Sequence, residues 1–451
     1  MLGTRYRLDS SWRRPGGGQV LIAGSPLRLF RLSTGGAQVV AMVEAGEAPD
    51  TAAVHQLLDR FVDAGALHPE HPGSPLSTAD VTVVIPAYGR LPAETPAGVK
   101  VIVVDDASPM ALTPARSPLV TVVRHEVNRG PAAARNTGLG GVTTPLVAFV
   151  DTDVELPDGW LQPLLAHFAD ERVALVAPRV AGAPGPSWLA GYEQRHGPLD
   201  LGDQPARIAA GTRVSYVPAA ALVCRTAALR DLGGFDDTMR LGEDVDLVWR
   251  LAEAGHRCRY EPAAVVHHQP RPTLPALLAQ RVGYGRSAAA LDRRHPGAVA
   301  PLRMSGWSAL VWLLAALRHP LLALGVAGST AIALQRKLHD VPPADAARLA
   351  GLGHLAAGRQ WAQAIVRVWW PIALVAAVVC RRARLPVAAA FLAPALVDAA
   401  RSRSGQPLVD APLHSAEQMA YGAGVWAGAV AERTVGPLLP EFRNWPPRTG
   451  G

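Results

Sequence analysis

Four short apolar runs in the middle of the chain predict buried β-strands. Runs of this length and apolarity are typical of parallel strands that are covered on both faces. Segment 131–139, between the third and fourth runs, has a helix-compatible pattern and begins with proline, which is favoured in a first helical turn. This alternation predicts a doubly wound α/β sheet that binds ligands at the carboxyl ends of its strands. The four runs are residues 81–86, 101–104, 119–123 and 146–150.

A smaller α/β pattern precedes them. Residues 20–22 and 27–32 have the pattern of short strands, and residues 36–43 and 51–64 have helical spacing. Gly65 is placed to follow the second helix, where a left-handed residue commonly ends a helix. The stretch 67–75 is rich in Pro, Gly and Ser and is interpreted as a linker. We therefore expect a small winged-helix-like α/β domain over residues 1–75 and the doubly wound domain over residues 76–300.

The last third of the chain is apolar and rich in Trp. Its runs 307–317, 321–334 and 368–380 are each shorter than the ~20 residues that span a bilayer. Basic residues interrupt or flank these runs, which favours helices lying at a membrane surface. A buried helical bundle is the alternative. We expect an apolar helical region over residues 301–440 and a loose tail over residues 441–451. The basic residues are Arg318, Arg336, Lys337, Arg367, Arg381, Arg382 and Arg384.

Composition narrows the class of protein. With 451 residues, 49% of them hydrophobic, most of the chain is not disordered. Its 3 Cys residues form neither a disulfide framework nor a zinc motif, and no apolar signal core is present near the start, so we expect a cytoplasmic location. A net charge of +7 favours an anionic partner such as a nucleotide sugar or an acidic membrane surface. Nucleic acid is disfavoured because the Arg residues are dispersed.

Carboxylates follow the predicted strands at the edge where ligands bind. Asp151 and Asp153 come directly after run 146–150, so their side chains can converge on one hard cation such as Mg²⁺ or Mn²⁺. A cation there would neutralise charge on a leaving diphosphate. Asp105 and Asp106 follow run 101–104 and can accept hydrogen bonds from a nucleotide base or ribose, although Asp-Asp-x-Ser is also good turn chemistry.

The remaining candidates for nucleotide-sugar binding lie beside these acids. Arg135 and the first amides of the predicted helix 131–139 can meet a phosphate, with a helix cap and a surface Arg as the alternative. The polar turn after the first strand completes the set. The expected nucleotide-sugar ligands are Pro86, Ala87, Tyr88, Arg90, Asp105, Asp106, Arg135 and Asp151.

A second acidic group lies farther along the chain. Glu243 and Asp244 begin a predicted helix, where acids are stabilised by the helix dipole. The functional alternative to this capping role is a general base that takes a proton from an attacking hydroxyl. His267 and His268 follow a short apolar run, and either could be a metal ligand. Adjacent residues on a strand face opposite ways, so only one of them can fill that role.

Five motifs resemble family 2 glycosyltransferases with the GT-A fold, a doubly wound mixed sheet, and cover about residues 80–270. The resemblance implies a nucleotide-sugar donor, a divalent metal (Mg²⁺ or Mn²⁺) on Asp151 and Asp153, and inverting transfer with Asp244 as the base. Glu243 is the second candidate for that base. A family His some two dozen residues beyond the Glu-Asp pair binds the metal, which favours His268. The motifs are residues 81–86, 103–108, 128–138, 151–153 and 242–247.

Further family-like segments lie at residues 24–29, 214–224, 284–288, 305–307 and 420–428. With these segments, the whole chain is similar to the mycofactocin-system glycosyltransferases. This similarity implies UDP-glucose as donor, pre-mycofactocin as acceptor, a β-1,4-linked glucose chain as product, and a place on the cytoplasmic side of the cell membrane. The first domain resembles PqqD-type peptide-holding domains, with a structural cap as the alternative. The Pro-rich stretch 269–272 departs from the pattern and leaves the choice of metal-binding His open.

Three other functions compete with this one. A transferase for a lipid or cell-wall glycan keeps the chemistry and changes the acceptor, and the basic, apolar last third favours it. A catalytically inactive membrane scaffold on a GT-A frame is disfavoured because all the expected carboxylates are present. A nucleotidyltransferase would also use a metal and a doubly wound sheet, but would release pyrophosphate rather than UDP.

Overall fold

The computed structural model describes residues 4–47, 51–92, 94–113, 117–401 and 407–443. The chain forms two compact units. The first contains Met1–Arg13 and Leu21–Arg271, and the second contains Arg14–Val20 and Pro272–Gly451. Residue 300, where we expected the sheet domain to end, therefore lies inside the second unit.

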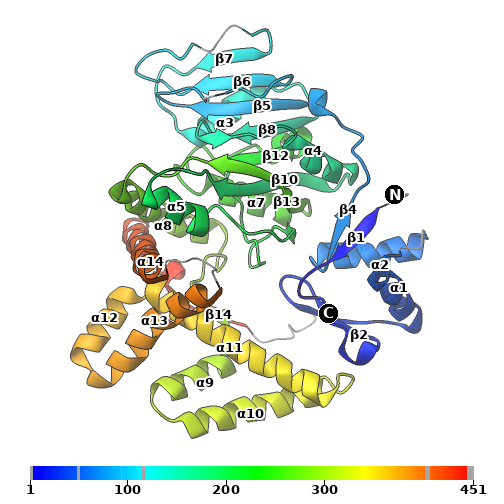
Figure 1. Cartoon of the computed structure of the whole chain (residues 1–451), viewed down its shortest axis with the longest axis vertical. Coiled ribbons are helices and arrows are strands. Elements are labelled where there is room, and N and C mark those ends of the chain that lie inside the picture. The colour runs from blue at the N-terminus through cyan, green and yellow to red at the C-terminus, as the bar shows by residue number, and fades with distance from the viewer. Residues whose placement is uncertain (1–3, 48–50, 93, 114–116, 402–406, 444–451) are drawn as a thin grey trace. The chain divides into compact units, whose positions relative to one another are not determined.

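A nine-stranded sheet is the centre of the first unit (Figure 1). The four predicted strands are confirmed, and they pair in parallel in the order β8-β5-β6-β7. Their side chains build the apolar core of the sheet, together with residues of the later strands. These strands are β5 (Val81–Ala87), β6 (Lys100–Asp105), β7 (Val120–Arg124) and β8 (Leu146–Val150).

The other half of the sheet makes it mixed. Strand β12 (Ala221–Arg225) lies between β8 and β10 (Val173–Gly182) and is antiparallel to both. Strand β13 (Arg257–His268) is parallel to β10 and carries β11 (Ala206–Arg207) on its outer side. The short β9 (Val154–Glu155) pairs with the last two residues of β13. This pairing brings the chain after β8 to the end of β13.

Helices cover this sheet and set the positions of several site residues. Helix α3 packs against β5 and β6, and α4 and α7 pack against β13. The contact of α3 is close because Gly138 faces β5, where a Cβ atom would lie 2.2 Å from Val84. The helix predicted at 131–139 is thus confirmed. The helices are α3 (Pro131–Gly141), α4 (Leu161–Ala166), α5 (Trp188–His196), α6 (Thr226–Asp231) and α7 (Glu243–Glu253), with short 3₁₀ turns at Thr78–Asp80 and His167–Ala169.

The first residues form a small α/β part, as the pattern predicts. Its apolar core includes Trp12, Leu58 and Phe61. The predicted linker 67–75 is wrong at its start, because Leu67 and His68 are buried in a strand that pairs with β1. The winged-helix likeness stays a prediction. The elements are β1 (Arg5–Leu8), β2 (Val20–Ala23), β3 (Arg28–Arg31), α1 (Thr34–Glu44), α2 (Ala52–Asp63) and β4 (Leu67–Glu70).

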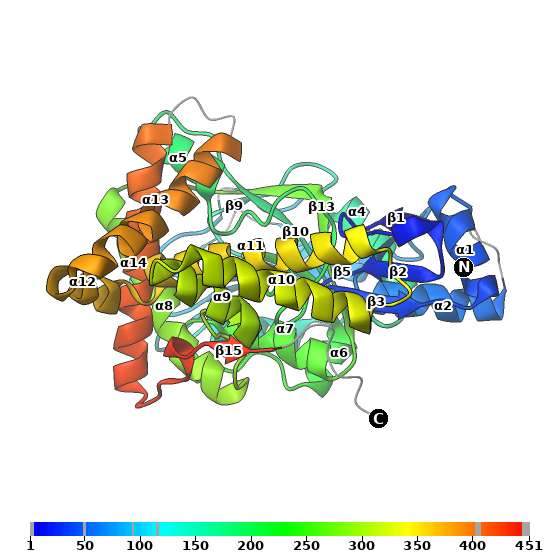
Figure 2. The same cartoon turned by 90° about the horizontal axis from the view of Figure 1, so that it is seen from below.

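The second unit is helical, and its helices α9, α10 and α12 cover most of the three predicted apolar runs. Helices α9, α10 and α11 lie side by side (Figure 2). No single helix in the described part of the chain is long and apolar enough to cross a membrane; α11 and α12 pass such a test together but are bent by 88°. The helices are α8 (Leu274–Arg294), α9 (Gly306–Ala316), α10 (Pro320–Lys337), α11 (Pro343–Arg367), α12 (Trp370–Val379), α13 (Arg384–Arg401) and α14 (Pro407–Ala431).

Two contacts tie the beginning of this unit to its end. Helices α8 and α14 cross so closely that a Cβ atom on Gly285 would lie 2.0 Å from the carbonyl oxygen of Tyr421. Beside this crossing, the buried Arg281 guanidinium lies 2.6 Å from the Glu417 carboxylate. Strand β14 (Arg303–Met304) pairs with β15 (Glu441–Phe442). The expected loose tail 441–451 therefore begins with a strand, and residues 444–451 lie outside the described residues.

Candidate active site

A buried arginine joins three elements at one edge of the sheet. Arg135 of α3 donates one hydrogen bond to Asp151, just after β8, and another to Glu243, the first residue of α7; both are 2.7 Å long. The side chain is 3% exposed and lies over the ring of Phe235. Burial opposes its charge, but the two carboxylates raise its pKa, so the guanidinium stays protonated. Because Arg135 is bound to two acids, its direct contact with a phosphate stays a prediction.

The start of α3 is fixed by Asp106. This carboxylate accepts hydrogen bonds from the backbone N–H groups of Arg129 (2.8 Å) and Gly130 (2.7 Å), and it lies 2.7 Å from Nδ1 of His125. Gly130 has φ = 93°, a left-handed conformation that glycine adopts without strain. Asp106 thus holds the turn from which Arg135 reaches the site.

Asp105 stabilises the neighbouring loop in a similar way. It is fully buried and accepts hydrogen bonds from the backbone N–H groups of Ser108 (2.9 Å) and Leu112 (3.2 Å) and from Arg124. Burial alone would raise the pKa of Asp105, but these hydrogen bonds lower it to about 2. Asp105 and Asp106 therefore have internal roles, and their contact with a nucleotide stays a prediction.

The turn after β5 reaches the same edge. Pro86 and Ala87 end the strand, and the Tyr88 side chain is 58% exposed. The backbone N–H of Gly89 donates to Ser108 Oγ at 2.8 Å, which ties this turn to the loop after β6. An exposed aromatic ring beside this edge is available to stack on a base.

Asp153 lies among three cationic or imidazole side chains. Its Oδ2 atom is 3.4 Å from Nε2 of His268, 3.5 Å from Nη2 of Arg271 and 3.7 Å from Nη2 of Arg90. Burial opposes ionisation of Asp153, but the hydrogen bond with His268 and the nearby positive charges lower its pKa. The carboxylate is therefore ionised at neutral pH.

The strand pairing distinguishes the two adjacent histidines. His268 pairs with Val154 of β9 and approaches Asp153, whereas its neighbour His267 pairs with Glu155. His268 is thus the one of the two whose ring approaches Asp153, and its role as a metal ligand stays a prediction.

Arg271 is a site residue that the sequence analysis missed. Its backbone N–H donates to Glu193 of α5 at 2.6 Å, which holds the chain after β13 near Asp153. The available signal is an arginine between two prolines, three residues after the candidate metal ligand His268. We interpreted that Pro-rich stretch only as a departure from the family pattern.

Few side chains of metal-binding type lie near Asp153. Among the described residues, no three His, Cys, Asp or Glu side chains form a group that could hold a metal ion. Asp153 and His268 still bring one carboxylate and one imidazole together, and Asp151 keeps a side chain that is 32% exposed. These donor types suit Mn²⁺ or Mg²⁺, which leave coordination positions for diphosphate oxygens and water.

The two acids that begin α7 differ in environment. Glu243 is buried and paired with Arg135, whereas Asp244 is half-buried and accepts hydrogen bonds from the backbone N–H groups of Ala219 (3.0 Å) and Val245 (2.8 Å). Burial and then the Asp244 charge raise the pKa of Glu243 to about 7, against the lowering effect of Arg135. Burial also raises the pKa of Asp244. A carboxylate with a raised pKa is a better proton acceptor near neutral pH.

Comparison with known proteins gives concordant results. The model of glycosyl transferase family 2 matches residues 82–232. The pre-mycofactocin glycosyltransferases of two Mycobacterium tuberculosis strains, CDC 1551 / Oshkosh and ATCC 25618 / H37Rv, are each 41% identical over 468 residues, covering 98% of both chains. The probable polypeptide N-acetylgalactosaminyltransferase 8 of Homo sapiens is 26% identical over 38% of this chain and 29% of its own length.

Solved structures show weaker similarity. The mannosyltransferase PcManGT from Pyrobaculum calidifontis, in complex with GDP-Man and Mn²⁺, aligns with a TM-score of 0.41 at 16% identity and covers 79% of this chain and 90% of its own. GalNAc-T7 with UDP, GalNAc and Mn²⁺ aligns with a TM-score of 0.33 at 16% identity, over 49% of this chain and 48% of its own.

Proposed function

Because the chain belongs to glycosyl transferase family 2 and, within it, to the family of the pre-mycofactocin glycosyltransferases, we propose that it transfers glucose from UDP-glucose to pre-mycofactocin. This acceptor is a redox cofactor of peptide origin, and repeated transfer builds a β-1,4-linked glucose chain on it. One structural observation carries the proposal. Arg135 hydrogen-bonds to Asp151 and Glu243, so motifs far apart in the sequence meet at one edge of the sheet.

The proposed reaction is a single displacement at the anomeric carbon of glucose. Asp244 takes the proton from an acceptor hydroxyl, and the hydroxyl oxygen forms a bond to the anomeric carbon. The bond between that carbon and the diphosphate oxygen breaks, and UDP leaves with the electron pair. Attack from the face opposite the leaving group inverts the configuration, so one base suffices. Glu243 keeps Arg135 in place rather than taking the proton, because its carboxylate is buried and already ion-paired.

The donor diphosphate is proposed to bind beside Asp153. Arg90 and Arg271 supply positive charge there. Asp153 and His268, with Asp151, would hold the divalent cation. That cation supplies charge neutralisation for the diphosphate and the leaving UDP.

Mass spectrometry of acceptor incubated with the full chain and UDP-glucose tests this function. We expect product masses that increase in steps of one hexose, with UDP released. EDTA should stop the reaction and added Mn²⁺ or Mg²⁺ should restore it, because the cation neutralises the leaving group. UDP-galactose serves as the donor control. Product in EDTA would contradict the metal requirement, and glucosylation of a lipid or cell-wall glycan acceptor alone would favour that second function.

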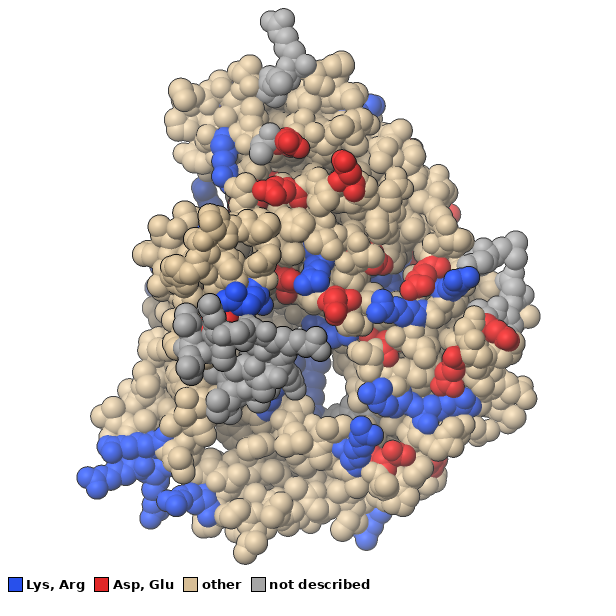
Figure 3. Space-filling view, in the orientation of Figure 1, with Lys and Arg blue, Asp and Glu red and all other residues tan. Residues whose placement is uncertain are grey.

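We also propose that the second unit binds the cytoplasmic face of the membrane. Large apolar side chains are exposed on α9, α10 and α12, and three arginines follow α12. Figure 3 shows a group of basic side chains at the lower left, where Figure 1 labels α12 and α13, and the surface around this group is mostly uncharged. Apolar side chains flanked by arginines are the composition expected for a surface that binds acidic lipids. The exposed residues include Leu313, Leu317, Leu321, Leu322, Val375, Val378 and Val379, and the arginines are Arg381, Arg382 and Arg384.

Flotation with vesicles of phosphatidylcholine and phosphatidylglycerol tests the membrane proposal. Replacing Arg381, Arg382 and Arg384 together by Ala should weaken binding on the order of 100-fold at low salt, since each loses an attraction to the anionic surface. As a matched control, replacing the exposed Arg5, Arg28 and Arg60 by Ala removes the same charge and should leave binding unchanged. Equal losses in the two triple variants would indicate a net-charge effect and would refute a specific surface.

A further inference from the structure

One short segment runs from the N-terminal part of the first unit to the acids of the active site. We propose that Arg213, at the start of segment 213–220, is a positioning residue: it clamps this segment to the N-terminal residues and thereby holds Ala219 and Ala220 against Asp244 and Asp151. The inference rests on the proposed role of Asp244. It assigns to the N-terminal part a function in catalysis that is separate from any binding of acceptor.

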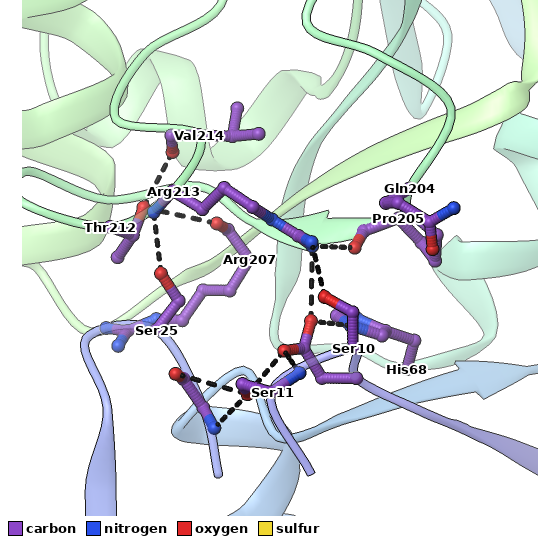
Figure 4. Close-up of polar contacts among 12 residues, drawn as sticks. Ser10, Ser11, Ser25, His68, Gln204, Pro205, Arg207, Thr212, Arg213 and Val214 are labelled. Atoms are coloured by element: carbon purple, nitrogen blue, oxygen red, sulfur yellow. Dashed lines mark hydrogen bonds and ion pairs between the residues drawn. The ribbon is translucent and has the colours of Figure 1, made fainter. Parts of the chain in front are cut away.

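The clamp consists of hydrogen bonds around the Arg213 backbone and side chain (Figure 4). Its guanidinium donates to Asp9 Oδ2 at 3.1 Å and to Ser10 Oγ at 3.1 Å, and its backbone N–H donates to Ser25 Oγ at 2.6 Å. The same guanidinium donates to the carbonyl oxygen of Pro205 at 2.7 Å. Arg213 therefore joins the N-terminal residues to Pro205, which directly precedes β11 of the sheet.

The residues around Asp9 keep its carboxylate ionised. It is 6% exposed, and its carboxylate lies 3.0 Å from Nε2 of His68 and accepts two hydrogen bonds from Ser11. Burial alone would raise the pKa of Asp9, but His68, Ser11 and Arg213 lower it to about 2. The ion pair with Arg213 thus persists over the pH range in which a transferase is assayed.

The other end of the segment contacts both acids. The backbone N–H of Ala219 donates to Asp244 Oδ2 at 3.0 Å, and the backbone carbonyl of Ala220 accepts from the N–H of Asp151 at 3.0 Å. These two residues precede β12, and because β12 is antiparallel to β8 they lie where β8 ends. Ala219 therefore holds Asp244, the candidate base, and Ala220 holds Asp151, a candidate ligand of the donor.

The segment between these ends is packed firmly enough to transmit a displacement. Val214, Val217 and Ala219 are at most 3% exposed, and the carbonyl oxygen of Ser215 accepts a 2.6 Å hydrogen bond from the Trp249 indole of α7. Pro218 further restricts the backbone before Ala219. Because buried, close-packed chain has little room to relax, loss of the clamp should shift Ala219 rather than be absorbed on the way.

A second ionic contact between the N-terminal residues and the sheet supplies a matched control. Arg172 lies 2.5 Å from Asp59 of α2, so it also joins the N-terminal residues to the sheet. Arg172 follows the 3₁₀ turn at His167–Ala169 and is not part of segment 213–220. Arg172→Ala therefore weakens the junction without releasing the segment.

The test compares Arg213→Ala with Arg172→Ala in the full chain, by steady-state kinetics and by hydrogen–deuterium exchange of peptides covering residues 213–220. Arg213→Ala should lower kcat by about 10- to 100-fold, a typical cost of a small misplacement of catalytic groups. Its KM for UDP-glucose should change less than kcat does, and the Ala219 amide should exchange faster. Arg172→Ala should keep wild-type kcat and wild-type exchange in this segment.

Ser25→Ala removes one hydrogen bond and should give a smaller loss of kcat in the same direction, which keeps the test valid if Arg213→Ala does not fold. Wild-type kcat and exchange in both the Arg213 and Ser25 variants would overturn the inference, as would an equal loss in Arg172→Ala. Failure of the proposed function is a separate result: the wild type then transfers no glucose, while the exchange measurement still shows whether Arg213 holds the segment.

Discussion

Asp244→Asn is expected to lower glucosyl transfer by about 10²- to 10⁴-fold while UDP-glucose binds nearly as in the wild type. The amide keeps the shape of the side chain and can still accept the hydrogen bond from Ala219, but it cannot take a proton. Single-turnover transfer and equilibrium binding of UDP-glucose measure the two effects separately. Glu253→Gln, at the exposed far end of α7, is the control and should leave both unchanged.

Turnover at the wild-type level in Asp244→Asn would assign the base elsewhere, first to Glu243.

The pH dependence of transfer by the wild type tests the direction of the pKa shift of Asp244. Burial raises the pKa of Asp244, and a base must be deprotonated, so the rate should fall as pH falls through this raised pKa. The acid limb should therefore lie above the ordinary aspartate value of about 3.9. Arg135, Glu243 and Asp151 are the charged groups that interact with Asp244: Arg135 lowers the pKa of Asp244, and the Asp151 charge raises it.

Arg135→Met is expected to destabilise the first unit by about 3–5 kcal/mol and to abolish transfer. The substitution leaves the buried carboxylate of Glu243 without its cation and frees Asp151 from its 2.7 Å hydrogen bond. Urea denaturation followed by tryptophan fluorescence measures the free energy of unfolding. Arg135→Lys should recover only part of it, because one ammonium group does not reproduce the fork that bonds both acids.

The double variant Arg135→Met with Glu243→Gln separates charge from packing. Removing the Glu243 carboxylate, which has lost its cation, should restore part of the stability. It should not restore the activity, because Asp151 still lacks its hydrogen bond from Arg135. A free energy of unfolding equal to that of the wild type in Arg135→Met would refute the buried ion pair as a stabilising element. Equal destabilisation in the single and double variants would mean that lost packing against Phe235 causes the effect.

The strands and the order of the site motifs could be predicted because they depend on local pattern. The apolar runs at 81–86 and 146–150 became β5 and β8, and Pro131 began α3 as expected. The contacts that assemble the site could not be predicted from pattern. Arg135 and Glu243 are 108 residues apart, and no periodicity predicts that a residue within one helix will meet the first residue of another.

The roles of the acids also depended on tertiary contacts. Asp105 and Asp106 were expected at the ligand edge and do lie at the end of β6. The bond from the Ser108 N–H to Asp105 agrees with the turn that Asp-Asp-x-Ser also predicts. The bonds from the Arg129 and Gly130 N–H groups to Asp106 join residues that the sequence could not match. The stretch 67–75 contains turn-forming residues throughout, yet its first part is a strand because β1 pairs with it. For Asp106 and for the start of the stretch 67–75, partners distant in sequence therefore decide the structure.

The contacts between α8 and α14 and between β14 and β15 have a consequence for biosynthesis. During translation, α8 emerges from the ribosome well before its partners, and Arg281 must wait for Glu417 to neutralise it. The helical unit therefore closes only near the end of synthesis, and a chain that terminates before α14 leaves Arg281 without Glu417 and the face of α8 that packs on α14 uncovered. Such truncated products should be recognised by chaperones or proteases rather than accumulate as a partly active enzyme.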